Sequence, residues 1–231
     1  MATLHLIRHG QASFGAADYD QLSDTGYRQG RVLGAWLAAT QTPGAVYTGT
    51  LKRHRQTLAA MEEGADSSWE SIRGELAGLN EFDHLAVLHA WNPAWSDRHA
   101  MARDLAETGE PRKAFQKAFV AAVERWVSGR NEADYAETWK GFQERVWAAI
   151  ETIMSEASGA GDIYAVTSGG PISVVAQRLL ALDDRKALGL NTVLANTSVS
   201  RMLFSGRRHS LAVFNNFSHL EAQDPALVTY R

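Results

Sequence analysis

The chain has 231 residues, of which 45% are hydrophobic and 21% charged, and its formal net charge is −3. This composition predicts a packed core rather than disorder, and the charge gives no basic footprint for nucleic acid. The absence of cysteine excludes disulfides, thiolate catalysis and cysteine-based metal sites. No apolar run approaches the roughly 20 residues that span a bilayer, and the N-terminus lacks the basic region of a signal peptide. We therefore expect a cytoplasmic protein that does not bind membranes.

Short apolar, β-prone segments alternate with segments of helical spacing along most of the chain. The predicted strands are 3–8, 45–48, a weak one at 72–79, 162–167, 198–204 and 210–215. Apolar stripes between them, such as Leu33, Trp36 and Leu37, predict helices. The alternation favours an α/β fold, a three-layer sandwich with a central mixed, mostly parallel sheet. The connection at 205–209 predicts a closing hairpin, which adds an antiparallel strand.

The stretch from about 85 to 157 shows no clear strand pattern. Its aromatic residues recur at helical spacing, for example Phe115, Phe119 and Trp126, and then Trp139 and Phe142. We interpret the stretch as a helical cap inserted into one α/β domain that spans 1–231. The aromatic side chains are expected to pack against one another, although some could face the mouth of a site.

Two predicted strands end in cationic side chains. Arg8 and His9 close the first strand, and Lys52, Arg53 and Arg55 follow the second. In an open α/β sheet, ligands bind beyond the carboxyl ends of the strands. The planar guanidinium group of arginine also matches the oxygens of a phosphate. The cations are therefore either solvated strand and helix ends or parts of a phosphate clamp.

Two further strand ends carry a carboxylate and a glycine-rich turn. Glu81 and Asp83 follow the weak third strand, where a carboxyl group could donate a proton to a leaving alcohol. A Ser-Gly-Gly run at 168–170 follows the fourth strand, and Pro171 suits the first turn of a helix. The N–H groups of that helix start would point at an anion. With His9 as a neutral imidazole that accepts a phosphoryl group, the four strand ends are complementary to a phosphoester.

Motifs at both ends of the chain resemble those of the histidine phosphatase superfamily, also called the phosphoglycerate mutase-like family. Residues 6–11, Leu-Ile-Arg-His-Gly-Gln, match its Arg-His-Gly signature. The stretch 22–29 is similar to the family pattern Leu-Ser/Thr-x-x-Gly-x-x-Gln, and 51–57 is similar to Leu-x-Arg-x-x-Gln-Thr. Asn196 and the stretch 216–220 also resemble family segments. The resemblance does not cover the helical insertion.

The resemblance implies a phosphoester hydrolase that acts on a small phosphorylated substrate through a phosphohistidine intermediate. Mutase-type phosphoryl transfer and a catalytically weakened phosphoester-binding protein are the alternatives. His9 would accept the phosphoryl group and Glu81 would donate or accept the proton. The implied phosphate-binding residues are Arg8, Gln11, Arg53, Ser168 and Gly169. The resemblance implies that no metal is used. We also expect no cofactor and no nucleic-acid partner, and a homodimer is possible.

Two positions depart from the family pattern. The family has His-Gly where this chain has Ser168-Gly169, and serine cannot hold a positive charge at neutral pH. Gly15 stands where many members have an asparagine that contacts the phosphate. Removal of one such donor in another enzyme costs roughly 100- to 1000-fold, so we expect reduced activity. No histidine near in sequence substitutes, and those at 84, 89, 209 and 219 could approach only through the fold.

Two other enzyme classes compete with this interpretation. A serine hydrolase would use Ser168 as the nucleophile, with Asp183 or Asp184 and then His209 or His219 in the expected chain order. That class leaves the Arg-His pair at the first strand unexplained, and the residue two before the serine is not small.

A metal-dependent hydrolase would use His5 and His9, which lie on the same face of one strand. No carboxylate accompanies that pair in the sequence, so a metal site is not favoured. A binding protein, in contrast, would not require His9 as a nucleophile. Phosphorylation of His9 therefore separates an enzyme from a binding protein.

Overall fold

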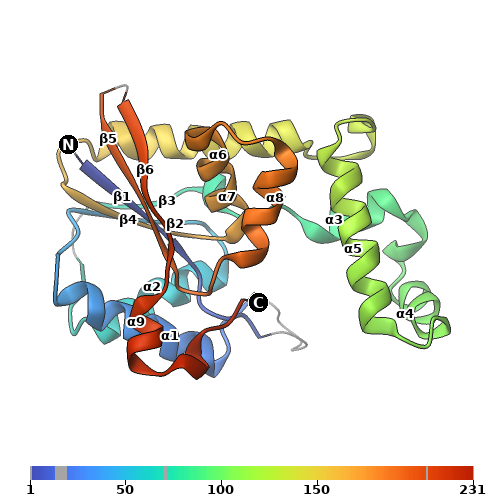
Figure 1. Cartoon of the computed structure of the whole chain (residues 1–231), viewed down its shortest axis with the longest axis horizontal. Coiled ribbons are helices and arrows are strands. Elements are labelled where there is room, and N and C mark those ends of the chain that lie inside the picture. The colour runs from blue at the N-terminus through green and yellow to red at the C-terminus, as the bar shows by residue number, and fades with distance from the viewer. Residues whose placement is uncertain (1, 14–19, 70–71, 207, 231) are drawn as a thin grey trace. The chain divides into compact units, whose positions relative to one another are not determined.

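The computed structural model describes residues 2–13, 20–69, 72–206 and 208–230 (Figure 1). They form two compact units. The first comprises Met1–Glu81 together with Arg145–Arg231, and the second is Phe82–Glu144. In the described part of the chain, no helix is both long enough and apolar enough to cross a membrane.

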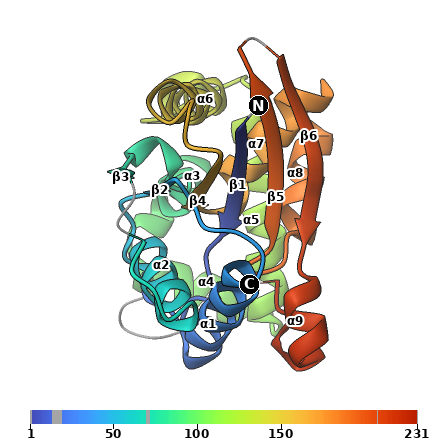
Figure 2. The same ribbon diagram turned by 90° about the vertical axis from the view of Figure 1, so that its left-hand side faces the viewer.

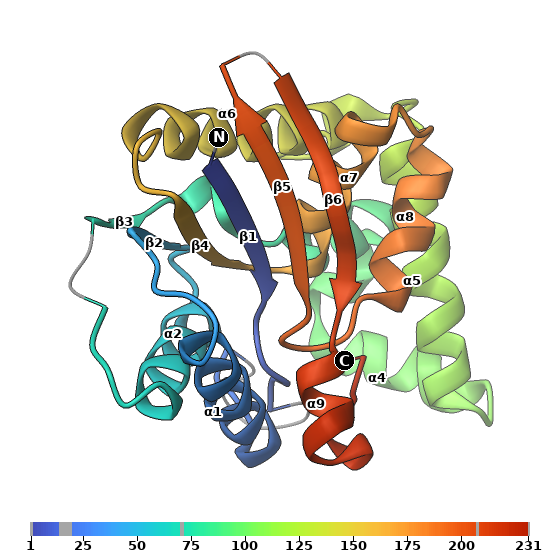
Figure 3. The ribbon, with the colours of Figure 1, turned by 60° about the vertical axis from the view of Figure 1, so that its left-hand side comes forward.

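The first unit contains a six-stranded sheet in the order β3-β2-β4-β1-β5-β6. Its strands are β1 (Ala2–Arg8), β2 (Ala45–Thr48), β3 (Ile72–Glu75), β4 (Asp162–Thr167), β5 (Val199–Ser205) and β6 (Arg208–Asn216). Strand β1 pairs in parallel with β4, and β2 pairs in parallel with β4 and β3. Strand β5 is antiparallel to both β1 and β6, and Figure 3 shows β4, β1, β5 and β6 side by side. The predicted α/β class with a mixed, mostly parallel sheet is confirmed.

Helices cover both faces of this sheet. The α-helices of the first unit are α1 (Asp24–Ala38), α2 (Lys52–Gly64), α7 (Gly169–Leu180), α8 (Asp184–Val193) and α9 (Ser218–Gln223), together with the part of α6 (Trp139–Glu156) from Arg145 onward. Figure 2 shows α1 and α2 side by side, and their apolar stripes pack on one face of the sheet, for example Leu33 and Met61 against Val166. Ile163 and Ala165 point to the opposite face and are as fully buried as Val166. The sheet is therefore a central layer, as predicted.

The third strand is shorter than predicted. It ends at Glu75, and 77–79 form a 3₁₀ turn, η1 (Ala77–Leu79). The turn is held by Arg145, whose Nη1 donates to the carbonyls of Ala77 and Gly78 at 3.0 and 3.2 Å. A contact with a residue so distant in sequence replaces the strand pairing that the local pattern predicts.

The second unit is helical. It contains α3 (His84–Trp91), η2 (Pro93–Ser96), α4 (Arg98–Glu107), α5 (Pro111–Val127), η3 (Glu132–Asp134) and the first part of α6 (Trp139–Glu156). All of 82–144 is described, and it contains no strand. Trp126 packs against Phe82 and Trp139 with ring centroids 4.8 and 5.2 Å apart. These aromatic side chains therefore form a core, as predicted.

Candidate functional site

His9 lies directly after β1, in a backbone that is fixed on both sides. Its N–H donates to the carbonyl of Thr167 at the end of β4, at 2.9 Å. Its carbonyl accepts from Asn196 Nδ2 at 3.1 Å. The next residue, Gly10, packs against the backbone of Gly26, where a Cβ would lie 2.6 Å from the carbonyl oxygen. Close approach of two backbones thus explains the glycine of the Arg-His-Gly motif.

The His9 ring is held in one tautomer. Its Nδ1 lies 2.7 Å from the carbonyl oxygen of Gly10, and Arg53 Nε lies 3.2 Å from its Nε2. Because a carbonyl only accepts and the guanidinium only donates, Nδ1 carries the proton and Nε2 carries the lone pair. Burial, followed by the charges of Arg53, His54 and Arg8, holds the pKa of His9 well below 6.5. His9 is therefore a neutral imidazole whose Nε2 lone pair accepts only from Arg53 among the described residues, and a neutral imidazole is the form that acts as a nucleophile.

The first turn of α2 carries Arg53 to His9. Arg53 Nη1 forms a 2.7 Å ion pair with Asp20 Oδ1. The other Asp20 oxygen accepts from Lys52 N at 2.8 Å, where it caps the helix start. Thr57 Oγ1 accepts from Gly10 N at 3.0 Å and donates to the carbonyl of Arg53 at 2.7 Å. The helix start and the loop after β1 are thereby locked together. The sequence motif includes Thr57 but gives no indication of Asp20.

The remaining cations do not all converge on His9. The Arg8 guanidinium donates to the carbonyls of Leu194 and Tyr230, although its charge contributes to the lowered pKa of His9. Arg55 makes a two-bond ion pair with Glu75 at 2.8 and 2.7 Å. Arg55 therefore belongs to the solvated helix face, whereas Arg53 does not.

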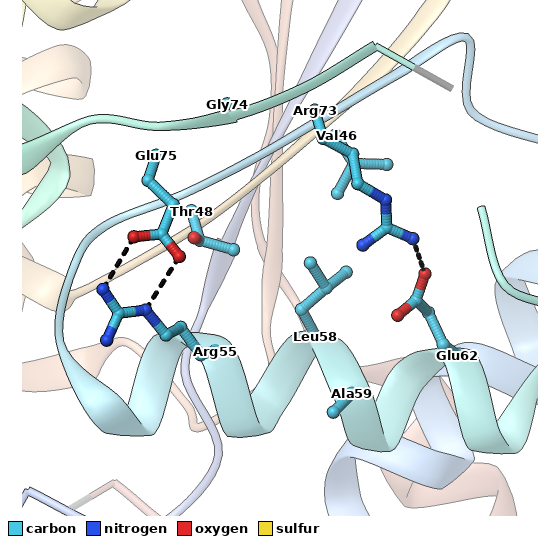
Figure 4. Close-up of a pocket in the computed structure, with 9 residues that line it drawn as sticks. All are labelled: Val46, Thr48, Arg55, Leu58, Ala59, Glu62, Arg73, Gly74 and Glu75. Carbon is cyan, nitrogen blue, oxygen red and sulfur yellow. Dashed lines mark hydrogen bonds and ion pairs between the residues drawn. The ribbon is translucent and has the colours of Figure 1, made fainter. Parts of the chain in front are cut away.

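A cavity of about 380 Å³ lies between α2 and the edge strand β3. Figure 4 shows that its charged side chains pair with one another, Arg55 with Glu75 and Arg73 with Glu62. None of the predicted site residues lines it. This cavity is therefore separate from the candidate site.

Gln11 continues the loop after His9. Its side-chain oxygen accepts from Ser23 Oγ at 2.8 Å, and its backbone N–H donates to Gln29 Oε1 at 2.8 Å. Ser23 is also the N-cap of α1 and accepts from Gly26 N at 3.1 Å. The family segment 22–29 thus holds the loop of the Arg-His-Gly motif in place.

At the end of β4, two of the groups expected to face an anion already make hydrogen bonds. Ser168 is fully buried, and its Oγ lies 2.8 Å from His54 Nε2. The Gly170 amide donates to Glu81 Oε2 at 3.1 Å. Gly169 packs against Asn191, whose Oδ1 would lie 2.1 Å from a Cβ. Glu81 is thus placed at the start of α7, whereas the Asp83 carboxylate caps α3.

His54 is the functional candidate that the sequence analysis missed. It is fully buried, and its ring centroid lies 5.6 Å from that of His9. Burial and the charge of Arg53 hold its pKa well below 6.5. Adjacent helical residues point roughly 100° apart, so the position of Arg53 does not predict that of His54. The available signal was a histidine beside a motif arginine at a predicted helix start.

The competing serine hydrolase is not assembled from the histidines predicted for it. His219 Nε2 lies 3.2 Å from Thr197 Oγ1, the ring of His209 packs against Trp147, and Asp183 caps α8. His5 Nε2 lies 2.8 Å from Asp162 Oδ1. Among the described residues, no group of three or more histidine, aspartate or glutamate side chains is placed to hold a metal ion. Gly15 lies outside the residues that the structure describes.

Comparison with known proteins agrees with the motifs. A family model described as histidine phosphatase superfamily (branch 1) matches residues 4–134 and 93–217. A phosphoglycerate mutase from Bacillus anthracis str. Sterne has a similar structure, with a TM-score of 0.64 and 20% identity over 95% of each chain. A phosphoserine phosphatase mutant from Entamoeba histolytica, in complex with phosphoserine, gives a TM-score of 0.63 and 15% identity over 95% of this chain and 100% of that chain. An alpha-ribazole phosphatase from Shigella flexneri gives 0.60 and 16% over 93% and 96%. At these identities the structural neighbours establish the fold.

Proposed function

The chain belongs to the histidine phosphatase superfamily, and on that premise we propose that it is a phosphoester hydrolase that acts through a phosphohistidine at His9. One observation carries the proposal. The buried, neutral ring of His9 directs its Nε2 lone pair at the N–H of Arg53, 3.2 Å away. The proposed nucleophile and a donor for the phosphoryl oxygens therefore lie in hydrogen-bond contact.

The first half of the proposed reaction transfers the phosphoryl group to the enzyme. His9 Nε2 attacks phosphorus, and the bond between phosphorus and the ester oxygen breaks. The Glu81 carboxyl group gives its proton to the departing alcohol oxygen. Arg53 binds the phosphoryl oxygens and exchanges its contact with the lone pair for a contact with phosphate. Arg8 binds them as well, and its guanidinium then gives up its bonds to the carbonyls of Leu194 and Tyr230.

In the second half, the Glu81 carboxylate takes a proton from a water molecule. The water oxygen attacks phosphorus, the bond between phosphorus and Nε2 breaks, and inorganic phosphate leaves with His9 neutral again. The proposed substrate is a small phosphorylated molecule, as is the phosphoserine in the complex from Entamoeba histolytica. In a mutase, an alcohol would take the place of water in this step.

A phosphoester-binding protein with weak turnover is the second candidate. Two observations favour the weak turnover, because Arg53 is already paired with Asp20 and the Gly170 amide with Glu81. An incoming phosphate must compete with these carboxylates. Ser168 supplies only a neutral donor.

A panel of phosphomonoesters tests the proposal, with inorganic phosphate and transferred phosphate both measured. An identically purified His9→Ala protein is the control for contaminating phosphatase. We expect at least one ester to release inorganic phosphate with the native protein and none to do so with the variant. Equal release by both proteins contradicts the proposal, and transfer to an added alcohol without hydrolysis assigns the site to a mutase.

A further inference from the structure

His54 is a buried histidine with one satisfied nitrogen. It is fully buried, and its Nε2 lies 2.8 Å from Ser168 Oγ. Its Nδ1 is also buried and has no hydrogen-bond partner among the residues that the structure describes. Because its pKa lies well below 6.5, the ring is neutral at neutral pH and carries a single N–H. The location of that proton decides whether His54 or Ser168 is the donor in the hydrogen bond between them.

The environment of Nδ1 determines where the proton is. A Cβ built on Gly49 would lie 2.2 Å from His54 Nδ1 and 2.8 Å from Cε1, so the glycine Cα abuts this edge of the ring. Asn80 Oδ1 lies 2.6 Å from the same Cβ, but it accepts from Thr50 N and makes no hydrogen bond to His54 Nδ1. A lone pair tolerates a neighbouring C–H group. An N–H pointing there would be a buried donor without an acceptor, which folded proteins rarely contain. The favourable tautomer therefore carries its proton on Nε2.

This tautomer fixes the direction of the Ser168 hydroxyl. With the proton on Nε2, His54 donates and Ser168 Oγ accepts. A hydroxyl has one proton of its own, which is then available for another acceptor. Residue 168 directly follows Thr167, whose carbonyl accepts the N–H of His9. Ser168 Oγ also lies 2.8 Å from the His54 ring, whose centroid is 5.6 Å from that of His9, so the hydroxyl and the proposed nucleophile flank the same imidazole.

We propose that His54 is a positioning residue that holds the Ser168 hydroxyl as a hydrogen-bond donor toward the phosphoryl group at His9. The inference rests on the proposed function and adds the imidazole of His54 to the groups that act around the phosphoryl group. In this chain the second imidazole comes from the first turn of α2 and acts through a serine at the end of β4. With the opposite tautomer, Ser168 would present only lone pairs to an anion, which would oppose binding.

The tautomer can be measured without any turnover. Protein labelled with ¹⁵N-histidine, with His54 assigned by comparison with His54→Gln, reports which nitrogen carries the proton. We expect the Nε2–H tautomer at pH 7, both without and with inorganic phosphate. The Nδ1–H tautomer overturns the inference. This result does not depend on hydrolysis, so a wrong tautomer for His54 and a failure of the phosphoester panel are distinguishable outcomes.

Kinetics test whether His54 acts through Ser168. On p-nitrophenyl phosphate we expect Ser168→Ala to lower kcat about 2- to 10-fold, the range for one neutral hydrogen bond. His54→Leu should lower kcat by a similar factor, and the double variant should lose no more than either single variant. His54→Gln, whose amide can donate to the same oxygen, should retain most of the rate.

His219→Leu is the matched control, because His219 is also buried and its Nε2 lies near a hydroxyl, that of Thr197. Its effect on kcat should multiply with that of Ser168→Ala, since the hydrogen bond of His219 goes to Thr197 and not to Ser168. If the effects of His54→Leu and Ser168→Ala multiply in the same way, or if His54→Leu retains the native kcat, the inference is wrong. Should His54→Leu fail to fold, His54→Gln and the tautomer measurement still decide.

Discussion

The ends of β1 and β4 lie side by side in the sheet, yet they are built differently. At the end of β1, His9 keeps its Nε2 lone pair, and the arginine that faces it comes from a motif readable in the sequence. At the end of β4, the Ser168 hydroxyl and the Gly170 amide are held by side chains from elsewhere in the chain, His54 and Glu81.

The start of α2 explains the difference. Successive helical residues point roughly 100° apart, so Arg53 reaches the end of β1 while His54 reaches the end of β4. One helical turn therefore serves two neighbouring strand ends. A motif can predict which strand ends meet, but the pairing of individual donors depends on where each helical side chain points.

The largest effect on the β4 side is expected from Glu81→Gln. If Glu81 protonates the leaving oxygen, kcat should fall by about 10²- to 10⁴-fold for alkyl phosphates. The loss should be much smaller for p-nitrophenyl phosphate, whose leaving group needs little protonation. Steady-state kinetics on both esters measure the difference. Asp83→Asn is the control, because the Asp83 carboxylate caps α3, and an equal loss on both esters would exclude proton donation by Glu81.

On the β1 side, Arg53→Lys should lower kcat by roughly 100-fold, the scale of losing one positioned donor. Lysine offers a point charge, whereas the guanidinium contacts His9 and Asp20 from separate nitrogens. Arg55→Lys is matched to it, since Arg55 lies two residues along α2 and pairs with Glu75. That variant should keep kcat near the native value. An equal loss of kcat in the two variants would show that Arg53 contributes no more to catalysis than Arg55 does.

A smaller effect, on stability, should be common to both strand ends. The pKa values of His9 and His54 are held well below 6.5 in the folded protein. Below pH 6.5 the unfolded chain binds protons that the folded protein does not. The free energy of unfolding therefore decreases as the pH is lowered. The limit is about 1.4 kcal/mol per pH unit for each histidine, and the fall levels off below the folded pKa.

Urea unfolding between pH 7 and pH 5 measures this slope. His9→Gln and His54→Gln should each flatten it by up to about 1.4 kcal/mol per pH unit, although their effects on kcat differ greatly. An unchanged slope in either variant would mean that its histidine titrates in the same range in the folded and unfolded states.

Much of the fold could be predicted because its signals are local. The strands at 45–48 and 162–167 have the predicted bounds, since continuous apolar runs between turn residues mark buried strands. The predicted strand at 72–79 was too long because Arg145 fixes its end as a turn. A residue that distant leaves no signal in the segment itself.

The site residues also divide into those with a local sequence signal and those set by contacts between distant segments. The motifs identify His9, Arg53 and Thr57, whose contacts hold one loop to one helix turn. The pair formed by His54 and Ser168 spans 114 residues, and its existence depends on the order of strands in the sheet. Asp20 follows a segment without a periodic pattern, so its ion pair with Arg53 was also not predictable.

Direct detection of the covalent intermediate tests the central claim. The native protein is mixed with p-nitrophenyl phosphate, quenched in alkali to preserve phosphohistidine, digested and mapped by mass spectrometry. The account predicts a phosphoryl group on His9, formed within a single turnover, and no label in His9→Ala. A phosphoryl group on Ser168, or hydrolysis without any label on His9, would contradict it.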